Sequence, residues 1–378
     1  MSTIGLVGIV PLLIGYYAAA SPTTVQTAFT IPSLMNIPSV LIVGRLSSIT
    51  GNKAPLIAGV CTVLISGLTP LFFELSFPMF IVVMAVMGLG TGTIMSTSVG
   101  LIAEHFEGVE QSNLMGMQSA FINIGAMIFA FVGGLLTGGD WRTAFAIYLL
   151  AVPILFICLI LIPKDKPVKK IGGLKNKNRT KIIISKEVFI VAAMSFLVFL
   201  TTTGVYTANT ALLIVERNLG EPAVANFAST IMTGSGIVVG VLYGFISKAC
   251  KNFILPLGYL LFACGTLLLG SATSVLMIYI GSVIIGAGMS TALPAGLFRC
   301  ARSVESGSAT FALSIFVSSI GAASFFSPMI MNPVARAVAD GSIHSRYIVG
   351  GIFAVAMAVL ALIYVQISDH KKKKHIDI

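Results

Sequence analysis

The sequence KDKPVKKIGGLKNKNRTK, residues 164–181, interrupts a chain that is otherwise strongly apolar. Extended to residue 186, this stretch carries nine Lys or Arg residues, so it is too polar to enter lipid. The whole chain has 378 residues, of which 56% are hydrophobic and 10% charged, and its mean hydropathy is +1.00. Soluble domains carry about 25% charged residues. The composition therefore excludes a soluble globular protein.

Six apolar segments precede the basic stretch and six follow it. A helix that crosses a bilayer needs about 20 apolar residues, which is close to the length of each segment. The segments are expected at 4–20, 26–47, 55–73, 78–102, 114–137 and 143–163, and then at 187–212, 223–247, 253–271, 274–298, 308–332 and 347–367. The first segment ends in three alanines that resemble a signal-peptide cleavage site, but no basic residue precedes it. We interpret it as a transmembrane helix.

These segments predict an all-α integral membrane protein in four parts. The parts are a six-helix bundle over 1–163, a basic cytoplasmic linker over 164–186, a second six-helix bundle over 187–368 and a basic cytoplasmic tail over 369–378. The two halves also repeat each other in sequence. GLGTGTIMSTSVGLI from Gly88 pairs with GAGMSTALPAGLF from Gly286, an offset of 198, and Asn123-Ile-Gly-Ala pairs with Ser319-Ile-Gly-Ala, an offset of 196. We therefore expect a duplicated six-helix unit with a pseudo-two-fold repeat, which is typical of transporters.

The distribution of basic residues predicts the orientation in the membrane. If the linker and the tail face the cytoplasm, 19 of the 23 Lys and Arg lie on that side. The other four lie outside, and they are Arg142, Arg217, Arg336 and Arg346. We expect a multi-pass protein of the cell membrane with both termini in the cytoplasm. The net charge of +10 is then a topology signal and not a sign of nucleic-acid binding. Anionic lipids are expected to contact the linker and the tail.

One loop carries a recognisable motif. GRLSSITGNK, residues 44–53, resembles the G-x-L-x-D-R-x-G-R-K signature between helices 2 and 3 of the major facilitator superfamily. Gly44, Leu46, Gly51 and Lys53 match the signature, whereas Ser48 and Ile49 replace its acidic residue and the basic residue that follows. The resemblance implies the twelve-helix major facilitator fold and transport by alternating access.

Further matches follow in the order that this family shows. Phe106, Glu110 and Gly116 resemble the F-P-x-x-E-R-G stretch, and Trp141-Arg142 with Phe145 resembles the W-R-x-x-F opening of helix 6. Gly116, Gly125, Gly133 and Gly134 fit the helix-5 glycine pattern of family exporters, although Phe129 and Ala130 replace its central Gly-Pro. This partial pattern favours export, while the alternative for each glycine is close helix packing. The expected conformational or gating residues are Gly44, Arg45, Gly51, Lys53, Glu104, Gly125, Gly133, Gly134 and Arg142.

The sequence lacks the groups that catalysis in a membrane would use. None of the 13 acidic residues and none of the four histidines falls in the middle of an apolar segment. The five cysteines show no CxxC spacing, so neither a zinc site nor a disulfide framework is indicated. We therefore expect no catalytic residue, no metal site and no cofactor, and we do not expect an enzyme.

Neutral polar residues within the segments are the candidates for binding a solute. Their alternative, for each Ser or Thr, is a hydrogen bond to a carbonyl of its own helix. The candidates are Tyr17, Asn36, Thr93, Ser96, Asn123, Thr202, Tyr206, Asn209, Ser290 and Thr291. In the family resembled, helices 1, 4, 7 and 10 surround the central cavity.

No Arg or Lys is expected to be buried, so the predicted solute is a small organic molecule that is neutral or amphipathic. We expect a monomeric transporter that exports this solute. The alternatives are an uptake permease for a nutrient or metabolite, and a ligand sensor without net flux.

Overall fold

A computed structural model describes residues 4–106, 108–137, 140–162, 185–304 and 309–374. Most of the predicted linker and the last four residues of the predicted tail lie outside these ranges. Every regular element within them is helical. The chain divides into two compact units. Unit 1 comprises Met1–Lys181 with Ala225–Phe227, and unit 2 comprises Ile182–Val224 and Ala228–Ile378.

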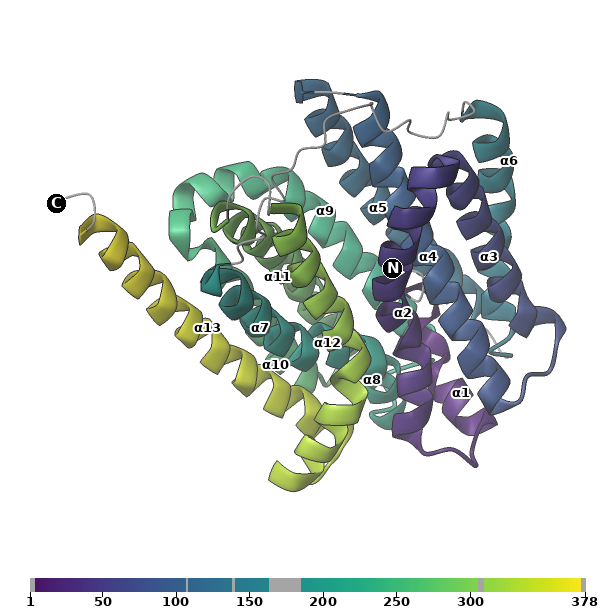
Figure 1. Ribbon diagram of the computed structural model, residues 1–378. Helices are drawn as coiled ribbons and strands as arrows, with labels where there is room; N and C mark the ends of the chain where they lie inside the picture. The colour runs from purple at the N-terminus through teal and green to yellow at the C-terminus, as the bar shows by residue number, and fades with distance from the viewer. Residues whose placement is uncertain (1–3, 107, 138–139, 163–184, 305–308, 375–378) are drawn as a thin grey trace. The chain divides into compact units, whose positions relative to one another are not determined.

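Unit 1 contains the first six predicted segments, coloured purple to blue in Figure 1. Helix α4 packs against both α2 and α3, while η1 packs against α5 and η2 packs against α3. Ser21 begins α2, because its hydroxyl accepts a hydrogen bond from the backbone N–H of Thr24 at 3.2 Å. The elements are η1 (Ile4–Ile9), α1 (Val10–Tyr16), α2 (Pro22–Thr50), α3 (Lys53–Phe72), α4 (Phe77–His105), α5 (Gly108–Leu136), η2 (Thr143–Leu150) and α6 (Ala151–Leu161).

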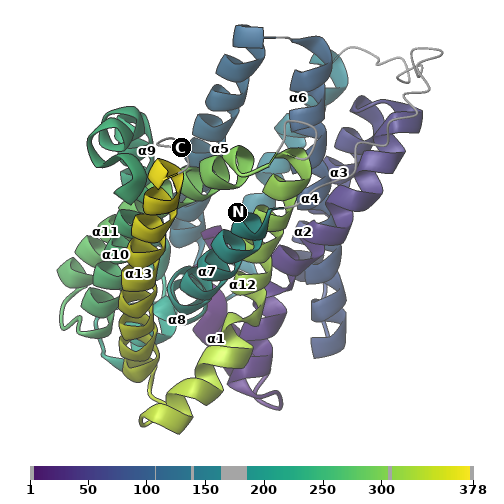
Figure 2. The ribbon, with the colours of Figure 1, turned by 60° about the vertical axis from the view of Figure 1, so that its left-hand side comes forward.

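Unit 2 contains the remaining six segments. Helix α10 packs against α11 and α13, and α7 packs against α12; Figure 2 shows α10, α11 and α13 side by side. Helix α13 continues to Lys374, beyond residue 368, where the second bundle was predicted to end. The elements are α7 (Lys186–Thr201), α8 (Thr203–Glu216), α9 (Val224–Cys250), η3 (Lys251–Phe253), α10 (Ile254–Gly270), α11 (Val275–Arg302), α12 (Ala309–Val338) and α13 (Ile343–Lys374).

The segment predicted at 187–212 is two helices and not one. Thr202 separates α7 from α8 with φ −115° and ψ −81°. Helix α12 approaches this point closely, because a Cβ at Gly204 would lie 2.4 Å from the Cβ of Ser327. The Ser327 hydroxyl donates to the carbonyl of Leu200 at 2.7 Å, which satisfies a backbone group beside the break.

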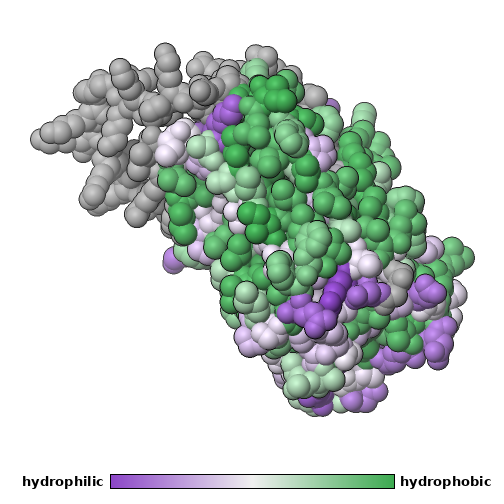
Figure 3. Space-filling view, turned by 90° about the vertical axis from the view of Figure 1, so that its right-hand side faces the viewer, coloured by the Kyte–Doolittle hydropathy of each residue, from purple (hydrophilic) through white to green (hydrophobic). Residues whose placement is uncertain are grey.

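The described residues contain eight stretches that are long and apolar enough to cross a membrane. One of them, Val224–Gly270, contains both α9 and α10, and two shorter apolar helices lie at Gly5–Tyr16 and Phe121–Leu136. Together with α2, these elements match the twelve predicted segments. Large apolar side chains such as Phe72, Ile160 and Val241 are exposed, as expected of a surface that faces lipid. Figure 3 shows one such face, on which hydrophobic residues predominate.

Candidate functional site

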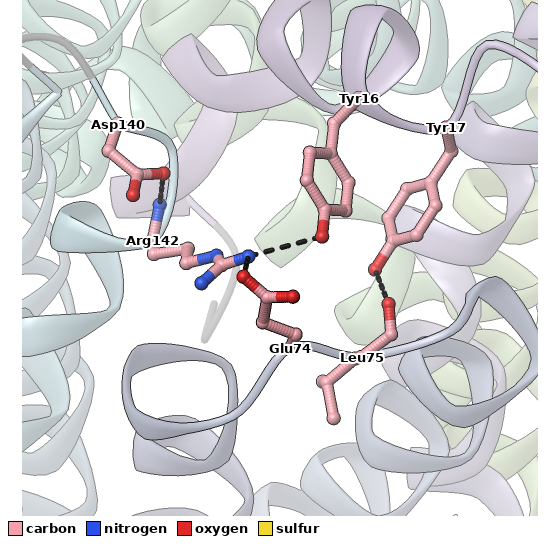
Figure 4. A network of polar contacts seen from close by, with 6 residues as sticks. All are labelled: Tyr16, Tyr17, Glu74, Leu75, Asp140 and Arg142. Atoms are coloured by element: carbon pink, nitrogen blue, oxygen red, sulfur yellow. Dashed lines mark hydrogen bonds and ion pairs between the residues drawn. The ribbon is translucent and has the colours of Figure 1, made fainter.

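Arg142 is the centre of a polar network in unit 1. Its Nη2 donates to the Tyr16 hydroxyl and to Glu74 Oε1, each at 3.1 Å. Tyr16 ends α1, Glu74 lies between α3 and α4, and Arg142 precedes η2, so three connections of the unit meet here (Figure 4). The hydrogen bond that Arg142 donates to Glu74 is the main cause that raises the pKa of Arg142. The predicted gating residue Arg142 is thus an ion-paired link between the ends of several helices.

Aromatic side chains pack against this network. Arg142 lies over the rings of Tyr16 and Trp141, 5.6 and 5.8 Å from their centroids. Trp141 contacts Tyr17 and Phe80, and it is almost fully buried. The Tyr17 hydroxyl donates to the carbonyl of Leu75 at 2.9 Å, as Figure 4 also shows. The solute-binding candidate Tyr17 is therefore a buried member of this cluster.

Lys53 holds the opposite end of the last helix in unit 1. Its Nζ donates to the carbonyl of Leu159 at 3.1 Å and also to that of Ile162. Both carbonyls belong to the C-terminal end of α6, where a cation is favoured by the helix dipole. Gly51 ends α2 with φ 80°, a conformation that favours glycine. These two motif residues thus join α2, α3 and α6.

The other conformational candidates differ in their packing. A Cβ at Gly133 would lie 1.9 Å from the carbonyl oxygen of Gly5, so α5 and η1 touch through backbone at this point. Gly134 is also buried, whereas a Cβ at Gly125 would meet nothing within 4 Å. Close packing therefore explains Gly133 but not Gly125. Gly44 and Arg45 lie on α2 and Glu104 lies on α4, but the surroundings of their side chains are outside the described part of the structure.

Two polar pairs join α2 to α4 in the interior of unit 1. The Thr91 hydroxyl donates to Asn36 Oδ1 at 2.8 Å, and the hydroxyls of Ser39 and Thr93 are 3.0 Å apart. Thr93 also donates to the Leu89 carbonyl of its own helix, which is the alternative that we considered for it. Candidates Ser96 on α4 and Asn123 on α5 are half-buried. The structure thus places Asn36 and Thr93 on facing helices.

Unit 2 has a more deeply buried polar interior. Tyr206 on α8 is fully buried, and its hydroxyl shares a hydrogen bond with Ser282 of α11 at 3.1 Å. Thr202 and Thr291 are also buried, and each donates to a carbonyl of its own helix, at 2.6 and 2.8 Å. Ser290 is half-buried. Of these candidates, Tyr206 is the one that links two helices.

Asn209 has a partner that was not expected from the sequence. Its Oδ1 accepts a hydrogen bond from Arg346 Nη1 at 2.8 Å, and Arg346 is only 9% exposed. The expectation that no Arg or Lys is buried is therefore wrong. Arg346 lies in the first turn of α13, and its side chain turns inward against α8. The sequence does show one feature that sets Arg346 apart. It follows Asp340 at the start of the twelfth segment, just as Arg142 follows Asp140 at the start of the sixth.

Arg217, also expected from the sequence to lie outside, forms further links in unit 2. Its Nη1 donates to the carbonyl of Ala272, and its Nη2 is 2.9 Å from Nδ1 of His344. That same Nδ1 is 2.7 Å from the carbonyl oxygen of Gly270. The end of α8 is thus joined to the connection between α10 and α11 and to the first turn of α13. None of the described residues forms a cluster of His, Cys, Asp or Glu that could hold a metal ion.

Comparisons with known proteins agree with this architecture. The sequence profile of the Major Facilitator Superfamily matches residues 1–199 and again residues 194–377. A crystal structure of a D-xylose-proton symporter is similar at 17% identity and a TM-score of 0.78, covering 95% of this chain and 93% of that one. The partially occluded, inward-open xylose transporter XylE from E. coli is similar at 17% identity and a TM-score of 0.73, with coverages of 96% and 94%.

A POT family transporter in complex with a thioalcohol-conjugated peptide shares 13% identity at a TM-score of 0.75, covering 96% of this chain and 93% of that one. No curated protein matches the chain significantly in sequence. At these identities the structural likeness shows the fold alone, whereas the family profile spans both halves of the chain. The chain is therefore a member of the major facilitator superfamily, a multi-pass membrane transporter and not an enzyme.

Proposed function

We propose that this protein exports a small amphipathic organic solute by alternating access. The observation that carries the proposal is the pair of polar interiors, one in each unit of a chain whose two halves both match the transporter family. Unit 1 offers an amide and hydroxyls on α2 and α4. Unit 2 offers hydroxyls, an amide and one buried cation. Such groups bind the polar part of a solute while apolar side chains contact the rest.

The proposed solute-binding residues remain the ten named from the sequence, and they fall into two groups. Asn36, Thr93, Ser96, Asn123 and Ser290 are half-buried, so the solute reaches them with little rearrangement. Tyr17, Thr202, Tyr206, Asn209 and Thr291 are buried and engaged with protein groups, so a solute must displace a partner to reach them. Export is proposed from the helix-5 glycines, of which Gly133 and Gly134 are buried.

Flux through the purified protein in liposomes tests transport. Dansylglycine and dansylglycinamide are suitable probes, since they share an apolar ring system and differ in a carboxylate against a neutral amide. The proposal is supported if either probe crosses the membrane of liposomes that contain the protein faster than that of protein-free liposomes. Equal movement, with protein that still shows a cooperative thermal transition, contradicts it. In intact cells, expression should lower the accumulated probe, whereas a rise would indicate uptake.

The proposed topology places the protein in the cell membrane with both termini in the cytoplasm. It functions there as a monomer, and its basic linker and tail contact anionic lipid. Single cysteines at Lys175 and at Gly220, in a background without the five native cysteines, test the orientation. A membrane-impermeant thiol reagent should label the cysteine at Gly220 from outside and the one at Lys175 only after lysis. Labelling of both from outside would contradict the assignment.

A further inference from the structure

Arg346 is a buried cation that makes no ion pair within the described part of the chain, although the charge of Glu216 at the end of α8 acts on it from a distance. The residue is 9% exposed. Asp340, which is near in sequence, is turned toward Ser342, whose N–H and hydroxyl bind its Oδ1 at 3.0 and 2.8 Å. A buried charge is costly unless an opposite charge compensates it. This position therefore favours an incoming anion.

The edge of the Arg346 guanidinium that is formed by Nε and Nη2 makes almost no hydrogen bonds. Nη1 donates to Asn209 Oδ1 at 2.8 Å, and Nη2 makes one long contact of 3.4 Å with the carbonyl of Gly341. Nε is buried and has no hydrogen-bond partner. The N–H groups of Nε and Nη2 point in the same direction, and this is an edge to which a carboxylate binds through both oxygens.

The groups around Arg346 hold the guanidinium in place, and the contact that they make with this edge is the long one from Nη2 to Gly341. Asn209 is 1% exposed, and its amide also donates to the carbonyl of Val205 at 3.1 Å, so it fixes Nη1 against α8. The next residues on each helix, Thr210 and Tyr347, bind each other through hydroxyls 2.8 Å apart. The guanidinium is thus hydrogen-bonded to neutral groups, and among the described residues no ion pair neutralises its charge.

We propose that Arg346 binds the carboxylate of the transported solute through Nε and Nη2, while Asn209 positions the guanidinium. This inference rests on the proposed transport function and extends it to a substrate class, small organic monocarboxylates. One positive charge with one free edge matches one carboxylate, whereas a phosphate dianion needs further cations. A lipid headgroup is a poorer fit, because the side chain turns inward to a residue that is 1% exposed.

The test measures the thermal unfolding midpoint of the purified full-length protein in detergent. Dansylglycine and benzoate are compared with their neutral amides, dansylglycinamide and benzamide, at up to 50 mM. Each carboxylate should raise the midpoint of the wild-type protein by about 1–3 °C more than its amide does. Arg346→Gln, which can still hydrogen-bond Asn209, should abolish this difference. Arg346→Lys should reduce it, because a lysine keeps the charge but loses the two-donor edge.

Arg302→Gln provides the matched control, since Arg302 is an exposed arginine of the same unit, at the end of α11. This variant should keep the full difference between carboxylate and amide. Equal responses to acids and amides in the wild type would overturn the proposal, as would an unchanged response in Arg346→Gln. A larger shift with inorganic phosphate or with anionic lipid, lost in Arg346→Gln, would overturn the assignment to a solute carboxylate.

Flux measurements separate this inference from the proposed function. If the carboxylate effect depends on Arg346 but neither dansyl probe crosses the liposome membrane, the binding site stands and the transport proposal fails. If dansylglycinamide is transported while carboxylates neither stabilise the protein nor move faster, transport stands and the role of Arg346 fails.

Discussion

Each unit has an arginine at the start of its last membrane segment, and the surroundings of these two arginines differ. Arg142 in unit 1 is paired with Glu74, a side chain that is 81% exposed, and it also contacts two aromatic rings. Arg346 in unit 2 is buried, and its hydrogen-bond partners are the neutral Asn209 and Gly341. A charge that is already neutralised can serve as a structural link. A buried charge that has no ion-paired acid can serve to bind the acid group of a ligand.

The largest difference is expected in the transport of a carboxylate. Arg346→Lys should raise the concentration of dansylglycine needed for half-maximal flux roughly ten- to hundredfold, because hydrogen bonds to a charged group contribute about 1.5–3 kcal/mol. Arg142→Lys should change this concentration less than about fivefold, since a surface ion pair contributes about 1 kcal/mol or less. Proteoliposome flux measures both variants. An equal rise of this concentration in both variants would contradict the proposed difference between the two arginines.

Glycine substitutions test whether unit 1 depends on backbone packing more than on Arg142. Gly133→Ala should lower the free energy of unfolding by about 1–3 kcal/mol, because its Cβ would overlap the carbonyl of Gly5. Gly125→Ala is the control, since a Cβ there meets nothing within 4 Å, and alanine also favours the helix. Thermal and denaturant unfolding measure the pair. A stable Gly133→Ala variant would show that α5 and η1 can separate at low cost.

A smaller effect is expected from the ion pair of unit 1. Glu74→Gln should destabilise the protein by no more than about 1 kcal/mol, because both ends of the pair are reached by water. The difference from wild type should shrink further in 0.5 M salt, where exposed charges are screened over about 4 Å or less. If Glu74→Gln lowered the free energy of unfolding by several kcal/mol regardless of salt, Arg142 would behave as a buried charge.

The smallest effect concerns pH at the start of α13. Hydrogen bonds from the hydroxyl and N–H of Ser342 hold the pKa of Asp340 below its ordinary value of 3.8. A lowered pKa stabilises the fold above the ordinary value, and this contribution is lost as the pH falls through the folded-state pKa. The midpoint of Asp340→Asn should therefore differ from that of wild type at pH 6 and converge with it below about pH 4. A difference that stays constant with pH would contradict this role.

Much of the fold could be predicted from the sequence, because a membrane segment is recognised from its own residues. The basic stretch 164–181 separates six apolar runs from six others, and the family profile confirms the resemblance that the loop at residues 44–53 suggested. The candidate site was harder to predict from the sequence. Thr93, Thr202 and Thr291 are polar residues in apolar segments, but only the structure shows that each hydroxyl binds its own helix.

The sequence by itself determined which segments enter the membrane, since hydropathy and charge act locally along the chain. Only the tertiary structure decided the environment of single residues near the segment ends. Counting basic residues placed Arg346 in an outer connection, but its burial depends on α8, and its partner Asn209 is 137 residues away. Lys53 likewise reaches carbonyls more than 100 residues distant. A local pattern can show that a charge lies at the edge of the membrane, but packing between distant helices decides whether that charge faces water or the protein interior.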